Sequence, residues 1–165
     1  MGEQLQETNQ YLTFSLDDEV FALEIGKVRE VLDLTTVTKV PQTCDFMRGV
    51  INLRGNVVPV VDMRRRFDMA PAEATVNSCI IIVEVSFGSE TAILGAIADA
   101  VEEVLELEPG LIEPPPKIGA KMDTGFIRGM GRRDERFIII LNIDNIFSNN
   151  DLLPATGGDA NEDAA

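Results

Sequence analysis

The sequence predicts an all-β protein made of two similar small lobes. Short runs of alternating or β-branched residues recur along the chain, and residues that favour tight turns separate neighbouring runs. In addition, the stretch 46–67 resembles the stretch 126–147. Short strands at such regular spacing favour small barrels over a parallel sheet.

The predicted strands begin with two hairpins. Residues 11–25 alternate on either side of the acidic turn at 17–19, which is typical of a hairpin. Residues 49–62 do the same around Gly55-Asn56, a pair that favours a two-residue turn. Three further runs have the composition of strands, and they cover residues 79–85, 92–98 and 136–143.

The internal repeat supports the division into two lobes. Four identical residues fall in step when the two stretches are aligned without a gap. The aligned pairs are Phe46 and Phe126, Arg48 and Arg128, Gly49 and Gly129, and Phe67 and Phe147. Each stretch also follows a similar segment, at 28–32 and 101–105, whose spacing fits a strand or a short helix. We therefore expect one domain over residues 10–148, with lobes at about 10–75 and 76–148.

The two ends of the chain have a different character. Residues 1–9 are polar, whereas residues 149–165 are acidic, contain glycine and show no hydrophobic period. Such segments cannot bury enough apolar surface to fold, so we predict that both are disordered. The proline-rich segment Pro109–Pro116 is expected to be an extended connector.

The charge of the chain excludes several kinds of partner. It carries 28 acidic and 14 basic residues, a formal net charge of −14, which repels nucleic acid and anionic membrane surfaces. No apolar run is long enough for direct insertion into a membrane. Cys44 and Cys79 do not form a Cys-x-x-Cys pair, which suits a reducing cytoplasm, although a bridge between them stays open.

The sequence also argues against an enzyme. It contains no histidine, the commonest general base and metal ligand, and no phosphate-binding Gly-x-x-x-x-Gly-Lys motif. Carboxylates such as Asp62, Asp99, Glu102 and Glu103 are interpreted as solvated surface. We expect no catalytic residue, no cofactor and no metal. A small-ligand-binding β-barrel protein is the alternative, but barrels of this size are expected to be filled by their own side chains.

The hairpin at 49–62 is apolar on both faces. A turn centred on Gly55-Asn56 would place Leu53 opposite Val58, and the side chains would alternate between the faces. Each face then needs cover, from the other lobe or from a partner. Pro59 cannot donate to a ladder and suits an edge strand. One face holds Ile51, Leu53, Val58 and Val60, and the other holds Val50, Asn52, Arg54, Val57, Pro59 and Val61.

The same segment carries a family resemblance. The run GVINLRGNVVPVVDMRRRF resembles the central signature of the CheW family of chemotaxis coupling proteins, and the resemblance covers about residues 10–148. It implies a CheW-like domain of two five-stranded, Src-homology-like barrels with a hydrophobic groove between them. It also implies a non-enzymatic adaptor in the cytoplasm, recruited to membrane-associated receptor arrays. The implied partners are the cytoplasmic hairpin tip of chemoreceptors and the regulatory domain of the chemotaxis histidine kinase.

The resemblance further implies which residues bind. Arg54 is expected to be the main receptor anchor, oriented by Glu30, with Arg48 in the same charge cluster. For kinase contact, Val57 and Pro59 are the first candidates. The family positions for receptor contact correspond here to Val28, Glu30, Arg48, Gly49 and Arg54.

Overall fold

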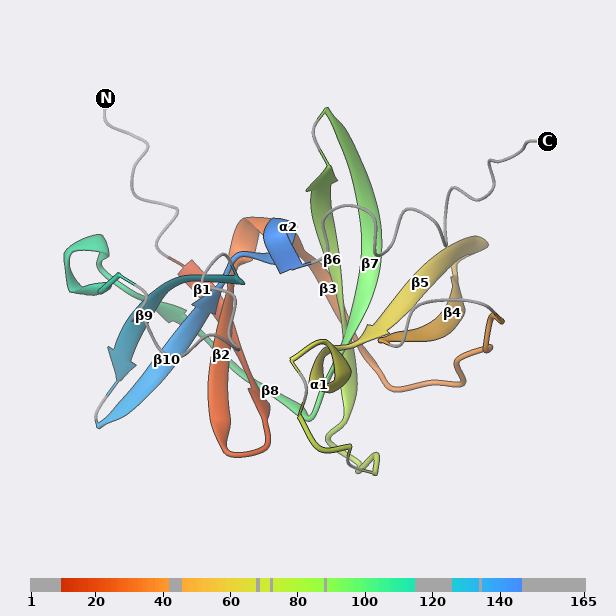
Figure 1. Ribbon diagram of the computed structural model, residues 1–165, viewed down its shortest axis with the longest axis horizontal. Coiled ribbons are helices and arrows are strands. Elements are labelled where there is room, and N and C mark those ends of the chain that lie inside the picture. The colour runs from red at the N-terminus through yellow and green to blue at the C-terminus, as the bar shows by residue number, and fades with distance from the viewer. Residues whose placement is uncertain are drawn as a thin grey trace.

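Two five-stranded sheets make up this computed structural model, which confirms the predicted all-β class. Residues 10–41, 46–67, 69–71, 73–87, 89–114, 126–133 and 135–146 are described. The first sheet, the terminal lobe, has the order β8 (Ala100–Glu106), β1 (Gln10–Leu16), β2 (Glu19–Glu24), β10 (Arg136–Leu141), β9 (Ile127–Arg133). The second sheet, the central lobe, has the order β3 (Val28–Asp33), β6 (Cys79–Phe87), β7 (Glu90–Ala98), β5 (Asn56–Asp62), β4 (Met47–Leu53). The lobes lie side by side in Figure 1.

Four short helical segments connect the strands. They are η3 (Ile25–Lys27), α1 (Met63–Arg66), η4 (Pro109–Leu111) and α2 (Ile143–Ile146). The segments at 28–32 and 101–105, whose spacing fitted either a strand or a short helix, are strands and lie in β3 and β8. The predicted disordered ends, residues 1–9 and 149–165, lie outside the described residues, as does the last part of the predicted connector.

The predicted lobe boundaries, 10–75 and 76–148, are wrong. The hairpin β1–β2 shares a sheet with β8, β9 and β10, while the hairpin β6–β7 shares a sheet with β3, β4 and β5. The reason lies in two very short connections: only η3 separates β2 from β3, and only Asp99 separates β7 from β8. At each of these points the chain crosses from one sheet into the other instead of turning back beside the strand that it has just left. The two sequence halves therefore exchange their opening hairpins.

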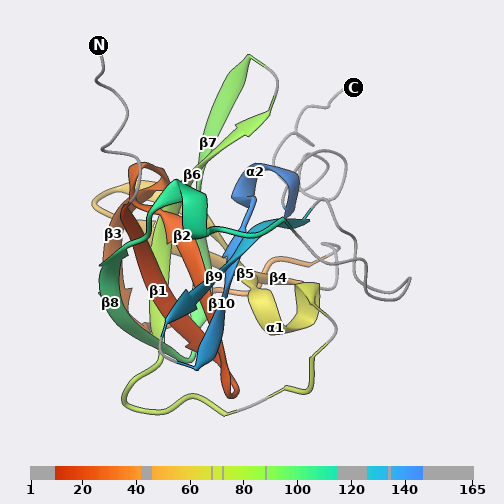
Figure 2. The same ribbon diagram turned by 90° about the vertical axis from the view of Figure 1, so that its left-hand side faces the viewer.

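The repeat itself is confirmed as a structural repeat. In each lobe a hairpin ends in a one-turn helix, β4–β5–α1 in the central lobe and β9–β10–α2 in the terminal lobe. The second strand of each hairpin then pairs in parallel with the exchanged hairpin, β5 with β7 and β10 with β2. Figure 2 shows the two short helices beside these strands.

Each sheet is nearly closed into a barrel by the loop that joins its two edge strands. After β3, Thr38 forms an isolated bridge with Val50 of β4, with N–O distances of 2.9 and 2.8 Å. After β8, Glu113 forms the equivalent bridge with Met130 of β9. Each lobe is therefore an open sheet curled toward a barrel, in agreement with the predicted two-barrel arrangement.

Three hydrophobic clusters fill the molecule. One lies inside the terminal lobe around Ile138 and Ile140, and one lies inside the central lobe around Val60 and Ile80. The largest joins the two lobes and includes Phe14 of β1. Strand β6 contributes to both faces, which explains its unbroken apolar run.

Candidate protein-interaction site

The turn of the β4–β5 hairpin lies one residue earlier than predicted. Leu53 pairs with Asn56, so Arg54 and Gly55 are the two turn residues, with φ angles of 51° and 90°. The Asn52 side chain stabilises this turn by accepting a hydrogen bond from the Gly55 amide at 2.7 Å. The predicted pairing of Leu53 with Val58 is therefore wrong, since Ile51 faces Val58. The predicted division of the hairpin into two faces is still correct. The earlier turn shifts each cross-strand pairing by two residues, and side chains two residues apart on a strand lie on the same face.

The second face of this hairpin is covered only at one end. Val61 is fully buried in the cluster between the lobes, whereas Val57, near the turn, is 73% exposed. Strand β5 pairs with β7 only from Val60 onward, so Pro59 lies just before the point where this pairing begins. The apolar tip is thus left to solvent, Val50 and Pro59 are partly buried, and Val61 is internal.

Arg54 and Glu30 form an ion pair at this tip, as the sequence analysis predicted. The Arg54 guanidinium donates a hydrogen bond to the Glu30 carboxylate, across from the turn to β3. The Arg54 side chain is 68% exposed and the Glu30 side chain 30%. Because the left-handed backbone at Arg54 carries its side chain beyond the strand, most of the guanidinium faces outward while Glu30 holds one edge.

A hollow of about 440 Å³ lies beside this ion pair at the open end of the central lobe. About half of its lining is apolar, and its rim carries the charges of Arg29, Glu30 and Arg54. An apolar floor with a charged rim is the composition of a protein-binding surface. The apolar and polar uncharged lining consists of Leu53, Asn56, Val57, Val58, Ile82 and Ile93.

Three of the expected receptor-contact residues do not join this hollow. Val28 packs against the cluster between the lobes. Gly49 is buried, and a Cβ there would lie 2.1 Å from the carbonyl oxygen of Thr38. Arg48 pairs with Asp62 at 3.1 Å and lines a different hollow. The predicted charge cluster of Arg48 with Arg54 and Glu30 is therefore wrong, and only the Glu30–Arg54 pair forms.

Sequence analysis missed the ion pairs that join the lobes. Arg64 of α1 is buried and donates to Asp99 at 3.1 and 2.6 Å, and to Asp17 in the β1–β2 turn. Burial alone would raise the pKa of Asp99, but its hydrogen bonds from Arg64 and from the Asp17 amide hold that pKa below the usual value. The interpretation of Asp99 as ordinary solvated surface is thus wrong.

We call the contacts of Arg64 with Asp99 and Asp17 the first clamp between the lobes. A second clamp occupies the equivalent place in the other repeat, with its charges reversed. Asp144 of α2 falls on Arg64 in the gapless alignment of the repeat. Its carboxylate accepts from Lys27 Nζ at 2.9 Å and from the Ser86 amide at 2.8 Å. Lys27 lies in η3, the first of the two connections that cross between the lobes, and Asp99 forms the second. The alignment of Arg64 with Asp144 was a signal from which both clamps could have been suspected.

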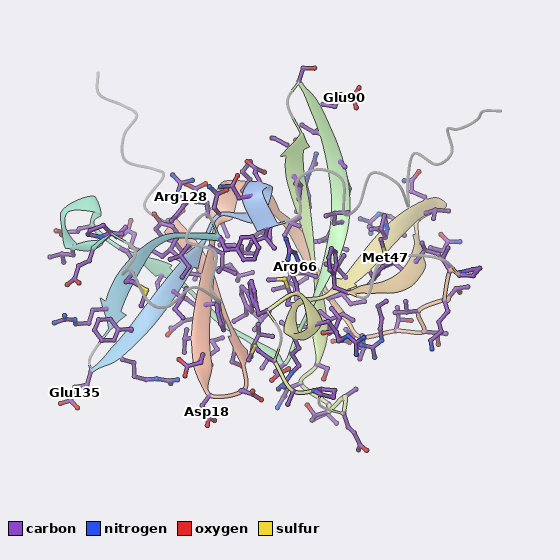
Figure 3. All side chains as sticks on the ribbon, in the orientation of Figure 1. Asp18, Met47, Arg66, Glu90, Arg128 and Glu135 are labelled. Carbon is purple, nitrogen blue, oxygen red and sulfur yellow. The ribbon has the colours of Figure 1, made fainter. Side chains whose placement is uncertain are left out.

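Arg66 also lies where the lobes meet, as Figure 3 shows. Its guanidinium stands over the rings of Phe46 and Phe126, at 5.0 and 4.5 Å from their centroids. Its Nε donates to the Ile146 carbonyl at 2.9 Å. The two phenylalanines that align in the repeat therefore meet across one arginine, which contributes to holding the lobes together.

The described residues give no second type of site. They contain no group of three or more histidine, cysteine, aspartate or glutamate side chains arranged to hold a metal ion. No described helix is long and apolar enough to cross a bilayer. Cys79 is buried with a free thiol whose pKa is raised by burial, while Cys44 lies outside the described residues.

The fold and this hollow define a class of protein: a two-lobed β module with a protein-binding surface at a hairpin tip. The comparisons identify the family. The CheW-like domain model matches residues 10–151, so the chain belongs to the CheW-like family. It is 33% identical over 143 residues to a probable chemotaxis protein CheW of Rhizobium etli, covering 87% of this chain and 90% of that one.

Two further similarities agree. The chemotaxis protein CheW of Klebsiella aerogenes is 32% identical over 143 residues, which is 87% of this chain and 84% of that protein. The crystal structure of the scaffolding protein TtCheW from Thermoanaerobacter tengcongensis superposes with a TM-score of 0.79 at 36% identity. This match covers 92% of this chain and 95% of that chain, so it includes both lobes.

Proposed function

We propose that this protein is a non-enzymatic cytoplasmic adaptor that couples chemoreceptors to the chemotaxis histidine kinase in membrane-associated arrays. The observation that carries the proposal is the Glu30–Arg54 pair on the rim of an apolar hollow. Relatives of the chain are named as chemotaxis proteins and a structural neighbour as a scaffolding protein, which supports it. The receptor tip and the kinase regulatory domain are the proposed partners.

Receptor contact is proposed for Arg54 and Glu30 directly, with Arg48 as a separate contact. Val28 and Gly49 are proposed to act indirectly, because the first packs between the lobes and the second is buried under a loop. Val57 and Pro59 are the proposed kinase contacts. The alternative of a small-ligand carrier has less support, since side chains such as Val60 and Ile80 fill the central lobe.

Replacing Arg54 by alanine tests the proposal. We expect binding to a receptor cytoplasmic fragment to weaken by roughly 2 kcal/mol or more, because a central interface arginine is lost. Thermal stability should change little, because an exposed ion pair contributes only about 0.2–1 kcal/mol. Titration calorimetry and a receptor-dependent kinase assay measure binding and coupling, and thermal melting measures stability.

Glu30→Ala and the double variant complete this experiment. We expect Glu30→Ala to have the same but a smaller effect, and a double-mutant cycle to reveal coupling between the two residues. Arg132→Ala is the matched control, because Arg132 is a similarly exposed arginine that pairs with Glu113 on the other lobe. The proposal fails if Arg54→Ala binds the receptor normally, or if its functional loss merely follows unfolding.

A second test places an aspartate on the exposed apolar tip. Val57→Asp should leave a cooperative unfolding transition, because the Val57 side chain is 73% exposed. We expect weaker association with the kinase regulatory domain, since a charge would have to be desolvated in the interface. Calorimetric titration with that domain, with circular dichroism as the folding check, gives the answer. Kinase affinity equal to wild type would remove Val57 from the interface.

A further inference from the structure

Two described cations lie close together on the central lobe without a partner among the described residues. Most basic side chains that the structure describes have an ion pair, a hydrogen bond or a ring contact. Among the basic residues whose side chains the structure describes, only Lys39 and Arg65 lack such a contact with another described residue.

Lys39 and Arg65 line one hollow of about 420 Å³ on the central lobe, together with Arg48. Lys39 comes from the loop after β3, Arg48 from β4 and Arg65 from α1, so three separate elements converge there. Val40, Met47 and Pro71 add an apolar wall. Figure 3 shows Met47 on this part of the central lobe.

Among the described residues that line this hollow, one is a carboxylate, and it is already engaged. Asp62 accepts from Arg48 at 3.1 Å and from the backbone amides of Arg64 and Arg65, at 3.0 and 3.4 Å, as the cap of α1. Its charge is therefore offset within the protein. The described lining therefore has three cations and one engaged anion, which makes it positive in a chain whose net charge is −14.

We propose that the hollow lined by Lys39, Arg48 and Arg65 docks an acidic peptide segment of a protein partner. Carboxylates spaced along an extended segment reach Lys39 and Arg65, and an apolar side chain between them contacts Val40 and Met47. A nucleic acid fits less well, because its continuous phosphate charge meets the field of a −14 chain. The inference deepens the proposed function, because Arg48 was already proposed as a separate receptor contact: it assigns an acidic ligand to the hollow that holds Arg48, which is distinct from the hollow beside the Glu30–Arg54 pair.

The test uses the full-length protein and a fluorescein-labelled synthetic peptide that alternates glutamate with alanine around a central leucine. Anisotropy at about 0.05 M salt should show saturable binding, which weakens as salt is raised. The same peptide with glutamine for glutamate should not bind. Arg65→Glu and, as a second variant, Lys39→Glu should each weaken binding roughly tenfold or more, because each replaces an attraction by a repulsion.

Arg132→Glu is the control for overall charge. It changes the net charge by the same amount, but Arg132 lies on β9 of the other lobe. Its effect on peptide affinity should stay within about twofold, since charges beyond a Debye length are screened. Equal weakening by Arg132→Glu and Arg65→Glu would overturn the proposal, because only the general field would matter.

The acidic C-terminal segment of the chain is the competing occupant. A full-length variant removes its charges, with Asp151→Asn, Asp159→Asn, Glu162→Gln and Asp163→Asn. If only this variant binds the peptide, the chain's own segment fills the hollow and the partner assignment is wrong. Because neither receptor nor kinase takes part, this experiment and the Arg54 experiment can fail independently.

Discussion

Arg64→Ala is expected to destabilise the protein by about 2–3 kcal/mol, because it removes a buried guanidinium together with its charge-assisted hydrogen bonds to two partly exposed carboxylates. Arg64 is 8% exposed and joins three separate segments. It donates to Asp99 at the second crossover, to Asp17 in the β1–β2 turn, and to the Ala70 carbonyl at 2.6 Å. Losing one side chain therefore disconnects α1 of the central lobe from the hairpin of the terminal lobe.

Urea denaturation measures this loss, with Arg48→Ala as the matched control. Arg48 also pairs with a carboxylate, Asp62, but its side chain is 46% exposed. An exposed pair contributes only about 0.2–1 kcal/mol, so the control should unfold near the wild-type midpoint. If both variants lose the same small amount, the Arg64 clamp does not hold the lobes together.

The same contact between Arg64 and Asp99 predicts that the stability of the folded protein depends on pH. The folded-state pKa of Asp99 lies below its unfolded value. Its contribution to stability is therefore present above the unfolded pKa of aspartate and is lost as the pH falls through the folded pKa. Stability of the wild type should fall in acid more steeply than that of Asp99→Asn. Parallel curves for the two proteins would contradict this role.

The second large loss of stability is expected from a substitution of Gly49. Gly49→Ala should destabilise the protein by about 3 kcal/mol, because the φ angle is +148° and the new Cβ would lie 2.1 Å from the Thr38 carbonyl oxygen. Thr38 cannot move away without breaking its bridge to Val50, which helps to close the central lobe. The loop would have to leave the strand, and that would open the barrel.

Two other glycines provide a graded comparison by urea denaturation. Gly26→Ala should be nearly neutral, because no atom lies within 4 Å of its added Cβ. Gly129→Ala should fall between them, since its added Cβ would lie 2.7 Å from an Ile112 side-chain atom and 2.9 Å from the Glu113 carbonyl oxygen, both longer than the 2.1 Å contact at Gly49. If Gly49→Ala is as stable as Gly26→Ala, the close approach of the loop is not required for folding.

These glycines also show how far the repeat could be interpreted from sequence. The alignment of Gly49 with Gly129 indicated two equivalent units, and the structure gives both the same position, under a loop that bridges to the edge strand. The bridging partners, Thr38 and Glu113, could not be predicted. They differ in residue type, because a backbone bridge places little demand on the side chain.

The candidate site was predictable in part for a similar reason. The pairing of Arg54 with Glu30 depends on a local turn and one neighbouring strand, and family resemblance placed both residues correctly. Arg48 was placed wrongly, because its partner was decided by the cap of α1, where Asp62 already lies. The hollow of Lys39 and Arg65 was missed because three elements distant in sequence meet there.

The sequence by itself determined the all-β class, the two faces of the 49–62 hairpin and the repeat of hairpin and short helix. These follow from alternation, turn residues and self-similarity, which are local properties of the chain. Only the tertiary structure decided which strands share a sheet. At η3 and at Asp99 the chain crosses into the other sheet instead of turning back, so each opening hairpin completes the lobe of the other half. Local patterns specify strands and faces, whereas the direction in which a short connection leaves a strand specifies its neighbours.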